Sequence, residues 1–139
     1  MKESLKRFLL LMRNKTGHGC QRIILCKFGE SQARRFLKSK GYRVIDKNYR
    51  TPFGELDIVA CKDGCFIFVE VKTKSSLEFG LPEEAVRGKK ILTIIRAARF
   101  YMKINRLYDC NASFGVISVM VKDNEVSEIK FIENAFEEV

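Results

Sequence analysis

The segment from Gly54 to Lys74, GELDIVACKDGCFIFVEVKTK, decides how the chain is interpreted. Two apolar runs flank the dipeptide Asp63-Gly64, and Asp-Gly between such runs is the strongest short signal for a two-residue β-hairpin turn. The segment therefore predicts two antiparallel strands. Each strand also carries a carboxylate, Asp57 in the first and Glu70 in the second, at a position where an apolar side chain is expected.

A two-residue turn determines which residues of the hairpin face each other. Residues pair when their numbers sum to 127, so Asp57 is predicted to lie opposite Glu70. Because side chains alternate between faces, one face is predicted to carry Leu56, Ile58, Ala60, Cys65, Ile67, Val69 and Val71. The other face is predicted to carry Val59, Cys61, Phe66 and Phe68 near the turn and Glu55, Asp57, Glu70 and Lys72 far from it. The charged groups are thus expected at one corner.

Opposed carboxylates are unfavourable unless something compensates them. Directly opposed residues have Cβ atoms about 4.5–5.5 Å apart. Two ionised carboxylates at about 5 Å repel by roughly 3 kcal/mol at an effective dielectric constant of about 20, whereas a favourable cross-strand pair contributes only ~0.2–1 kcal/mol. A cation or a proton must therefore lie between Asp57 and Glu70. Two interpretations remain open: an ion-pair cluster with Lys72, or a hard divalent cation held with waters and substrate phosphates.

The rest of the chain predicts an α/β fold with a mixed sheet flanked by helices. The expected elements are a short basic helix over residues 3–13, a linker over 14–19, a helix over 28–40 that stops at Gly41, and a strand over 42–50. The hairpin strands follow, then a long helix over 82–105 beginning at Pro82, and strands over 114–121 and 126–132. We divide the chain into an N-terminal extension and linker, residues 1–25, and one domain, residues 26–139.

Composition restricts the class of function. The 139 residues carry a formal charge of +9, and residues 1–50 hold 14 Lys and Arg against three acids, which favours nucleic acid over a membrane surface as partner. Five cysteines without a C-x-x-C pair and a single histidine, His18, fit neither a disulfide framework nor a Cys/His zinc site or imidazole catalysis. No run approaches a membrane span, so we expect a cytoplasmic protein.

Asp57, twelve intervening residues and then Glu70-Val71-Lys72 resemble the signature of the PD-(D/E)XK nuclease superfamily. The surrounding residues resemble those of the bacterial YraN family, and the resemblance covers residues 28–102. It is carried by Gly29-Glu30 with Ala33, by Asn48-Tyr49-Arg50, and by GELDIVA at 54–60, FVEVK at 68–72 and GLPEEAV at 80–86. This chain departs from the family at Ser113-Phe114-Gly115-Val116, where we expect Arg-Phe-Asp-Val.

The resemblance implies a restriction-endonuclease-like α-β-β-β-α-β core, similar to that of archaeal Holliday-junction resolvases, with a metal-dependent nuclease site. Asp57 and Glu70 would hold Mg²⁺ (or Mn²⁺) with the Val71 carbonyl nearby. Lys72 would orient or activate the attacking water, and Glu30 would complete the site. The departure at Gly115 leaves these ligands in place.

Three functional hypotheses follow. The first is a metal-dependent endonuclease that hydrolyses DNA phosphodiester bonds, with branched or structured DNA as one substrate; a homodimer would suit the two symmetry-related strands of branched DNA. The second is a non-catalytic nucleic-acid-binding module on the same fold. The third assigns the stripe of Leu5, Phe8, Leu9 and Met12 to membrane or partner docking, or to packing on the domain. Candidate phosphate contacts are Lys38, Lys40, Arg43, Arg50, Lys74, Arg87, Lys89 and Lys90.

Overall fold

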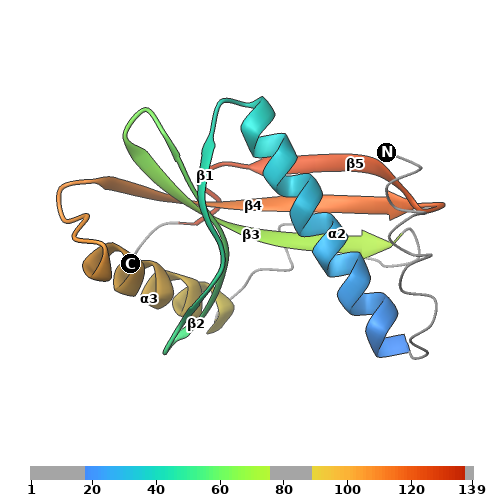
Figure 1. Ribbon diagram of the computed structural model, residues 1–139, viewed down its shortest axis with the longest axis horizontal. Helices are drawn as coiled ribbons and strands as arrows, with labels where there is room; N and C mark the ends of the chain where they lie inside the picture. Colours follow the sequence, from blue (N-terminus) through green and yellow to red (C-terminus); the bar gives the residue numbers. More distant parts are fainter. Residues whose placement is uncertain (1–17, 76–88, 137–139) are drawn as a thin grey trace.

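A five-stranded mixed sheet forms the centre of the protein, and its strands lie in the order β1-β2-β3-β4-β5. The computed structural model describes residues 18–75 and 89–136. β3 and β4 run parallel, and the other neighbouring strands are antiparallel (Figure 1). This confirms the predicted α/β fold with a mixed sheet, while the helix predicted over residues 3–13 lies outside the described residues. The elements are α2 (His18–Ser39), β1 (Arg43–Thr51), β2 (Gly54–Lys62), β3 (Cys65–Ser75), α3 (Lys89–Ile104), β4 (Asn111–Lys122) and β5 (Glu125–Ile132).

The two helices cover opposite faces of the sheet and enclose two hydrophobic clusters. α2 buries Phe28, Ala33 and Leu37 against apolar side chains of β2, β3 and β4. α3 contributes its predicted apolar side, including Ile94, to a second cluster that contains Phe68 of β3. Because the central strands are covered on both faces, they read as nearly continuous apolar runs in the sequence. A charged residue in these runs is therefore costly unless it has a partner.

The hairpin has the predicted turn and register. The ladder between β2 and β3 runs from Ile58 opposite Val69 to Lys62 opposite Cys65, and every pair sums to 127. Asp63 and Gly64 both have positive φ angles, 52° and 77°, as the two central residues of a type I′ turn require.

α2 begins earlier than predicted. It starts at His18 rather than near Phe28, so it includes the end of the predicted linker and crosses the predicted boundary between residues 25 and 26. Ile24 and Phe28, four residues apart and both buried, extend the apolar stripe by a turn that polar neighbours conceal in the sequence. The helix ends as predicted at Gly41 (φ 90°), where the Gly41 and Tyr42 amides donate to the Lys38 and Leu37 carbonyls in a Schellman motif.

The first residues of β2 lie on the opposite face from the one that strict alternation predicts. Leu56 was predicted beside Ile58, but it packs in the α3-side cluster, whereas Ile58 packs in the α2-side cluster. The register of β1 and β2 places Asn48 opposite Asp57, between two regular pairs. Asn48 has a left-handed backbone (φ 49°), which asparagine tolerates better than most residues. We attribute the change of face at Leu56 to this kink.

Gly29 allows α2 to approach β3 closely. A Cβ atom at Gly29 would lie 2.8 Å from Cβ and 2.9 Å from Cγ2 of Thr73, and still closer to the Thr73 hydroxyl oxygen. A side chain at position 29 therefore requires the helix or the strand to move. Since Glu30 follows Gly29, this close contact also determines how near Glu30 lies to the sheet.

We predict that Gly29→Ala lowers the free energy of unfolding by roughly 1–3 kcal/mol, as overpacking does. In an uncrowded helix the same change would stabilise by ~0.5–1 kcal/mol, so the sign of the effect tests the contact. Urea unfolding measures it, with Ser31→Ala in the same helix as control. In the double variant, Thr73→Ala should recover part of the loss; two additive single effects would contradict the contact.

Candidate active site

β2 and β3 separate at Asp57, and this fork forms the site. Past Ile58 and Val69 the described ladder stops, and Figure 1 shows β3 continuing along β4 while β1 and β2 run away from it. In a continued ladder the Val71 amide would face the carbonyl of Leu56. It donates instead to Oδ2 of Asp57, at 2.9 Å. The Asp57 carboxylate therefore takes the position of a backbone acceptor and satisfies an amide that the fork would otherwise leave unpaired.

Glu70 is buried beside this fork and is contacted by two lysines. Its side chain is only 5% exposed, and its Oε1 atom lies 3.4 Å from Nζ of Lys72 and 3.4 Å from Nζ of Lys90. Lys72 comes from the same strand, as predicted. Lys90 comes from the first turn of α3; the sequence suggested it as a phosphate contact, and the structure places it beside a carboxylate.

The expected conflict between the two carboxylates appears at Asp57. Burial and then the charge of Glu70 raise the pKa of Asp57 from 3.8 to about 8, although the bond from the Val71 amide acts in the opposite direction. Glu30 and a hydrogen bond with Glu70 contribute further increases. Near neutral pH, Asp57 therefore holds a proton unless another cation replaces it.

Glu30 reaches the site from α2 and is linked to β2 through Asn48. With its amide nitrogen directed at the carboxylates, Asn48 donates to Oε2 of Glu30 at 3.1 Å and to Oε1 of Glu55 at 3.2 Å. Burial raises the pKa of Glu30, and the bond from Asn48 opposes this shift. Glu55 was predicted in the corner with Asp57 and Glu70, but it lies on the α2 side because the strand changes face at the Asn48 kink. The sequence pattern gave no role to Asn48; an asparagine inside a predicted strand was the available signal.

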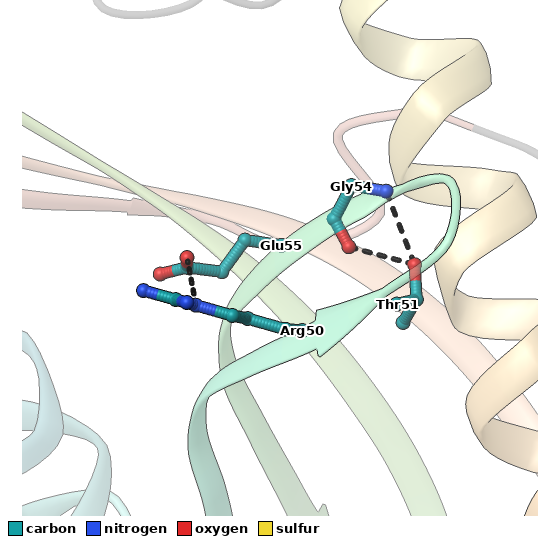
Figure 2. A network of polar contacts seen from close by, with 4 residues as sticks. All are labelled: Arg50, Thr51, Gly54 and Glu55. Carbon is teal, nitrogen blue, oxygen red and sulfur yellow. Dashed lines mark hydrogen bonds and ion pairs between the residues drawn. The ribbon is translucent and has the colours of Figure 1, made fainter.

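The turn between β1 and β2 is fixed by its own polar contacts (Figure 2). The Thr51 hydroxyl accepts from the amides of Phe53 and Gly54, both at 3.1 Å, and donates to the Gly54 carbonyl at 2.7 Å. Gly54 has φ 150°, and a Cβ atom there would lie 2.5 Å from Cγ2 of Thr93 in α3. Arg50, which is 90% exposed, lies 3.7 Å from Glu55 on the other side. These contacts fix the turn of the β1–β2 arm, the two strands from Arg43 to Lys62, which carries Asn48 and Glu55.

The departure at Gly115 affects packing between strands. A Cβ atom at Gly115 would meet Cε1 of Phe131 at 2.9 Å and Cδ1 of Ile67 at 3.1 Å, with the Ile132 carbonyl oxygen next at 3.3 Å. None of these atoms belongs to the carboxylate cluster. Phe131 of β5 fills the space that a side chain at position 115 would need.

The predicted phosphate contacts are spread over the surface. Arg43 and Arg50 lie toward opposite ends of β1. Lys38 and Lys40 lie near the Arg43 end, where α2 stops. Arg50 and Lys90 lie among the site residues, next to Glu55 and Glu70 respectively. Lys74 lies on β3 and Lys89 begins α3, whereas Arg87 is outside the described residues.

Two properties of the described residues limit what the site can be. Within residues 18–75 and 89–136, no three His, Cys, Asp or Glu side chains are arranged to hold a metal ion together. A cation at Asp57 and Glu70 would therefore need further ligands from backbone, water or substrate. In the same part of the chain, no helix is long and apolar enough to cross a membrane.

The fold and site define an α/β protein with a carboxylate pair at a strand fork. Residues 29–119 match the model of the family described as Uncharacterised protein family UPF0102. The chain is 47% identical over 110 residues to the UPF0102 protein of Alkaliphilus oremlandii (strain OhILAs), covering 78% of this chain and 93% of the relative. It is 44% identical over 109 residues to the UPF0102 protein of Syntrophomonas wolfei subsp. wolfei (strain DSM 2245B / Goettingen), covering 78% and 94%. This chain belongs to the UPF0102 family, which is YraN-like, so the family resemblance is confirmed.

We predict that Asp57→Asn stabilises the metal-free protein at high pH. The folded state binds the Asp57 proton more tightly than the unfolded chain does, so this contribution to stability is complete below about pH 4 and is lost as pH rises through about 8. At pH 9 the variant should exceed wild type by roughly 1–3 kcal/mol, and the difference should shrink toward pH 5. Urea unfolding in EDTA at several pH values measures this.

Asp109→Asn, which removes a charge from an exposed aspartate, is the matched control. If wild type and Asp57→Asn lose stability in parallel between pH 5 and 9, Asp57 is not the titrating group.

Proposed function

We propose that this protein is a metal-dependent endonuclease that hydrolyses phosphodiester bonds of DNA, with branched or structured DNA as a candidate substrate. The observation that carries the proposal is the pair formed by the half-buried Asp57 and the buried Glu70, in which burial and the charge of Glu70 raise the pKa of Asp57 to about 8. A proton is the smallest cation that relieves the repulsion between these groups. A divalent cation would do so more completely, and it would leave both carboxylates ionised.

The donor atoms suit a hard cation such as Mg²⁺ or Mn²⁺. Mg²⁺ is held in proteins by one or two carboxylates, and it retains waters and binds substrate phosphates. Asp57 and Glu70 would supply the carboxylates, with the Val71 carbonyl as a further oxygen. Because no third His, Cys, Asp or Glu of residues 18–75 and 89–136 is placed to hold an ion with this pair, the other ligands would be water and phosphate. When bound, the ion would polarise a phosphoryl oxygen and lower the pKa of a coordinated water.

Residues of the chain supply the remaining chemistry. The Lys72 ammonium, kept in place by Glu70 at 3.4 Å, would compensate negative charge that develops on the phosphate and would orient the attacking water. Glu30, whose pKa is raised by burial, is a stronger proton acceptor than an ordinary exposed glutamate and can take a proton from that water through an intervening solvent molecule. Asn48 keeps the Glu30 carboxylate directed toward β2.

One observation favours a second function, a nucleic-acid-binding module that does not cleave. Glu70 already has two lysine partners, so part of the negative charge is neutralised without a metal. In that case Lys72 and Lys90 would be structural cations, and Asp57 would remain protonated at neutral pH. The two functions therefore differ in whether the carboxylate pair binds a divalent cation.

We predict that wild type binds Mg²⁺ or Mn²⁺ and cleaves DNA, and that Asp57→Asn abolishes both activities. Lys72→Ala should retain metal binding but slow cleavage at least 100-fold, as expected for a lost charge-stabilising group. Metal binding is measured by titration calorimetry, and cleavage is measured on single-stranded, duplex and branched DNA. Affinity for the metal should increase from pH 6 to pH 8, because the ion must displace the Asp57 proton.

Asp109→Asn again serves as control and should leave both activities unchanged. DNA binding without metal binding or cleavage would identify a binding module and reject the nuclease. Full cleavage by Asp57→Asn would show that cleavage does not depend on the Asp57–Glu70 pair.

A further inference from the structure

Two adjoining cavities follow the side of α2 and meet at Glu30 and Asn48. One has a volume of about 580 Å³ and the other about 530 Å³, and Lys27, Glu30 and Asn48 line both of them. The first continues to Arg50 and Glu55 on the β1–β2 arm, and the second continues to Lys47 of β1. Because they share three lining residues, we treat them as one groove between α2 and the β1–β2 arm.

The groove is lined by more cations than acids. Its two acids, Glu30 and Glu55, are the pair joined by Asn48. The charge of Glu70 raises the pKa of Glu30, and the charge of Asp57 raises the pKa of Cys26 in the groove wall. The carboxylate fork therefore lies beside the part of the groove that contains Glu30. Six cations surround the acids, and all except the half-buried Arg34 are exposed: Arg22, Lys27, Arg34, Arg35, Lys47 and Arg50.

We infer that this groove binds the phosphate backbone of a nucleic-acid strand and carries one phosphate to the carboxylate fork. A row of cations along a groove matches a polymer with a phosphate at every nucleotide. A single small anion would need fewer cations than this groove provides. The inference rests on the proposed function, since it supplies the path by which a strand would reach that site. Of the six cations, only Arg50 was among the phosphate contacts suggested by the sequence.

The arrangement separates binding from chemistry. Arg34, Arg35 and Lys47 lie on one side of the Glu30–Asn48 contact, and Arg22 and Arg50 lie on the other. A strand held on both sides would pass over Lys27 and Glu30, and a phosphate close to the carboxylates would need a cation between itself and them. Phosphate contacts of this kind position a strand without reading its sequence, so we expect little sequence preference from the groove.

Charge reversal at two groove positions tests the inference. In metal-free buffer, the Arg35→Glu/Lys47→Glu double variant should bind a fluorescein-labelled DNA strand at least tenfold more weakly than wild type at about 0.1 M salt. Its slope of log affinity against log salt should be smaller by roughly two, because two phosphate contacts are lost. Fluorescence anisotropy with single-stranded and duplex DNA over a series of salt concentrations provides both quantities.

The matched control is Lys103→Glu/Lys122→Glu, which makes the same change in net charge at exposed positions of α3 and β4 outside the groove. It should shift affinity less than threefold and leave the salt slope nearly unchanged. Thermal unfolding of wild type and both double variants confirms that they are folded.

A cysteine in the groove provides a second readout. Cys26 lines the groove and is exposed, whereas Cys65 is exposed at the distant hairpin turn. A bound strand should slow alkylation of Cys26 by iodoacetamide several-fold and leave alkylation of Cys65 unchanged, as followed by peptide mass spectrometry.

The outcomes separate this inference from the proposed function. Equal loss of affinity in both double variants, or unprotected Cys26, overturns the groove as the strand path, although metal binding and cleavage by wild type would still support a nuclease. Displacement of the strand by equimolar pyrophosphate would make the groove a small-anion pocket and also overturn it. If wild type binds no DNA, both proposals fail.

Discussion

The hydrogen bond between the Val71 amide and the Asp57 carboxylate is the contact on which the site depends. Two paired strands can separate inside a covered sheet only if the amides and carbonyls released at the fork find other partners. Asp57 supplies one such partner at 2.9 Å, and it does so with an ionisable group in a half-buried position. The same contact that permits the fork therefore places a carboxylate beside Glu70, and the rise in the pKa of Asp57 is its electrostatic consequence.

Local departures from regular structure give the fork its surroundings. The left-handed residue Asn48 lies opposite Asp57 and sends its amide toward α2. Gly29 lets α2 come close enough to β3 for Glu30 to meet that amide. Each feature alone is less favourable than regular structure, because a left-handed asparagine and a helical glycine both reduce stability by up to about 1 kcal/mol. Their common effect is to bring Glu30 of α2 close to Glu55 and Asp57 of β2.

The sequence was informative wherever one local rule decided the geometry. The Asp63-Gly64 turn determines the register of the hairpin, so the approach of Asp57 to Glu70 could be predicted from this one segment. The face of Leu56 and the place of Glu55 could not, because both depend on a kink in a different strand. The partnership of Lys90 with Glu70 depends on how α3 returns to the sheet, and the early start of α2 depends on tertiary packing of Ile24. The pattern of a single segment is thus not sufficient to predict contacts between different helices and strands.

The charge balance of the site bears on its two candidate functions. Glu30, Glu55, Glu70 and ionised Asp57 carry four negative charges, and Arg50, Lys72 and Lys90 lie near them with three positive charges. With Asp57 protonated these seven groups balance, and Arg34 adds a further positive charge near Glu30, so the described charges are compensated without metal. In the proposed nuclease, a phosphate that enters along the groove would add negative charge, and the cluster would then need a further cation. Because both the proton and a divalent ion could meet this need, the pKa of Asp57 would set the pH at which a metal displaces the proton. With that pKa raised to about 8, the exchange would fall near neutral pH, where the arrival of substrate and metal would control it together.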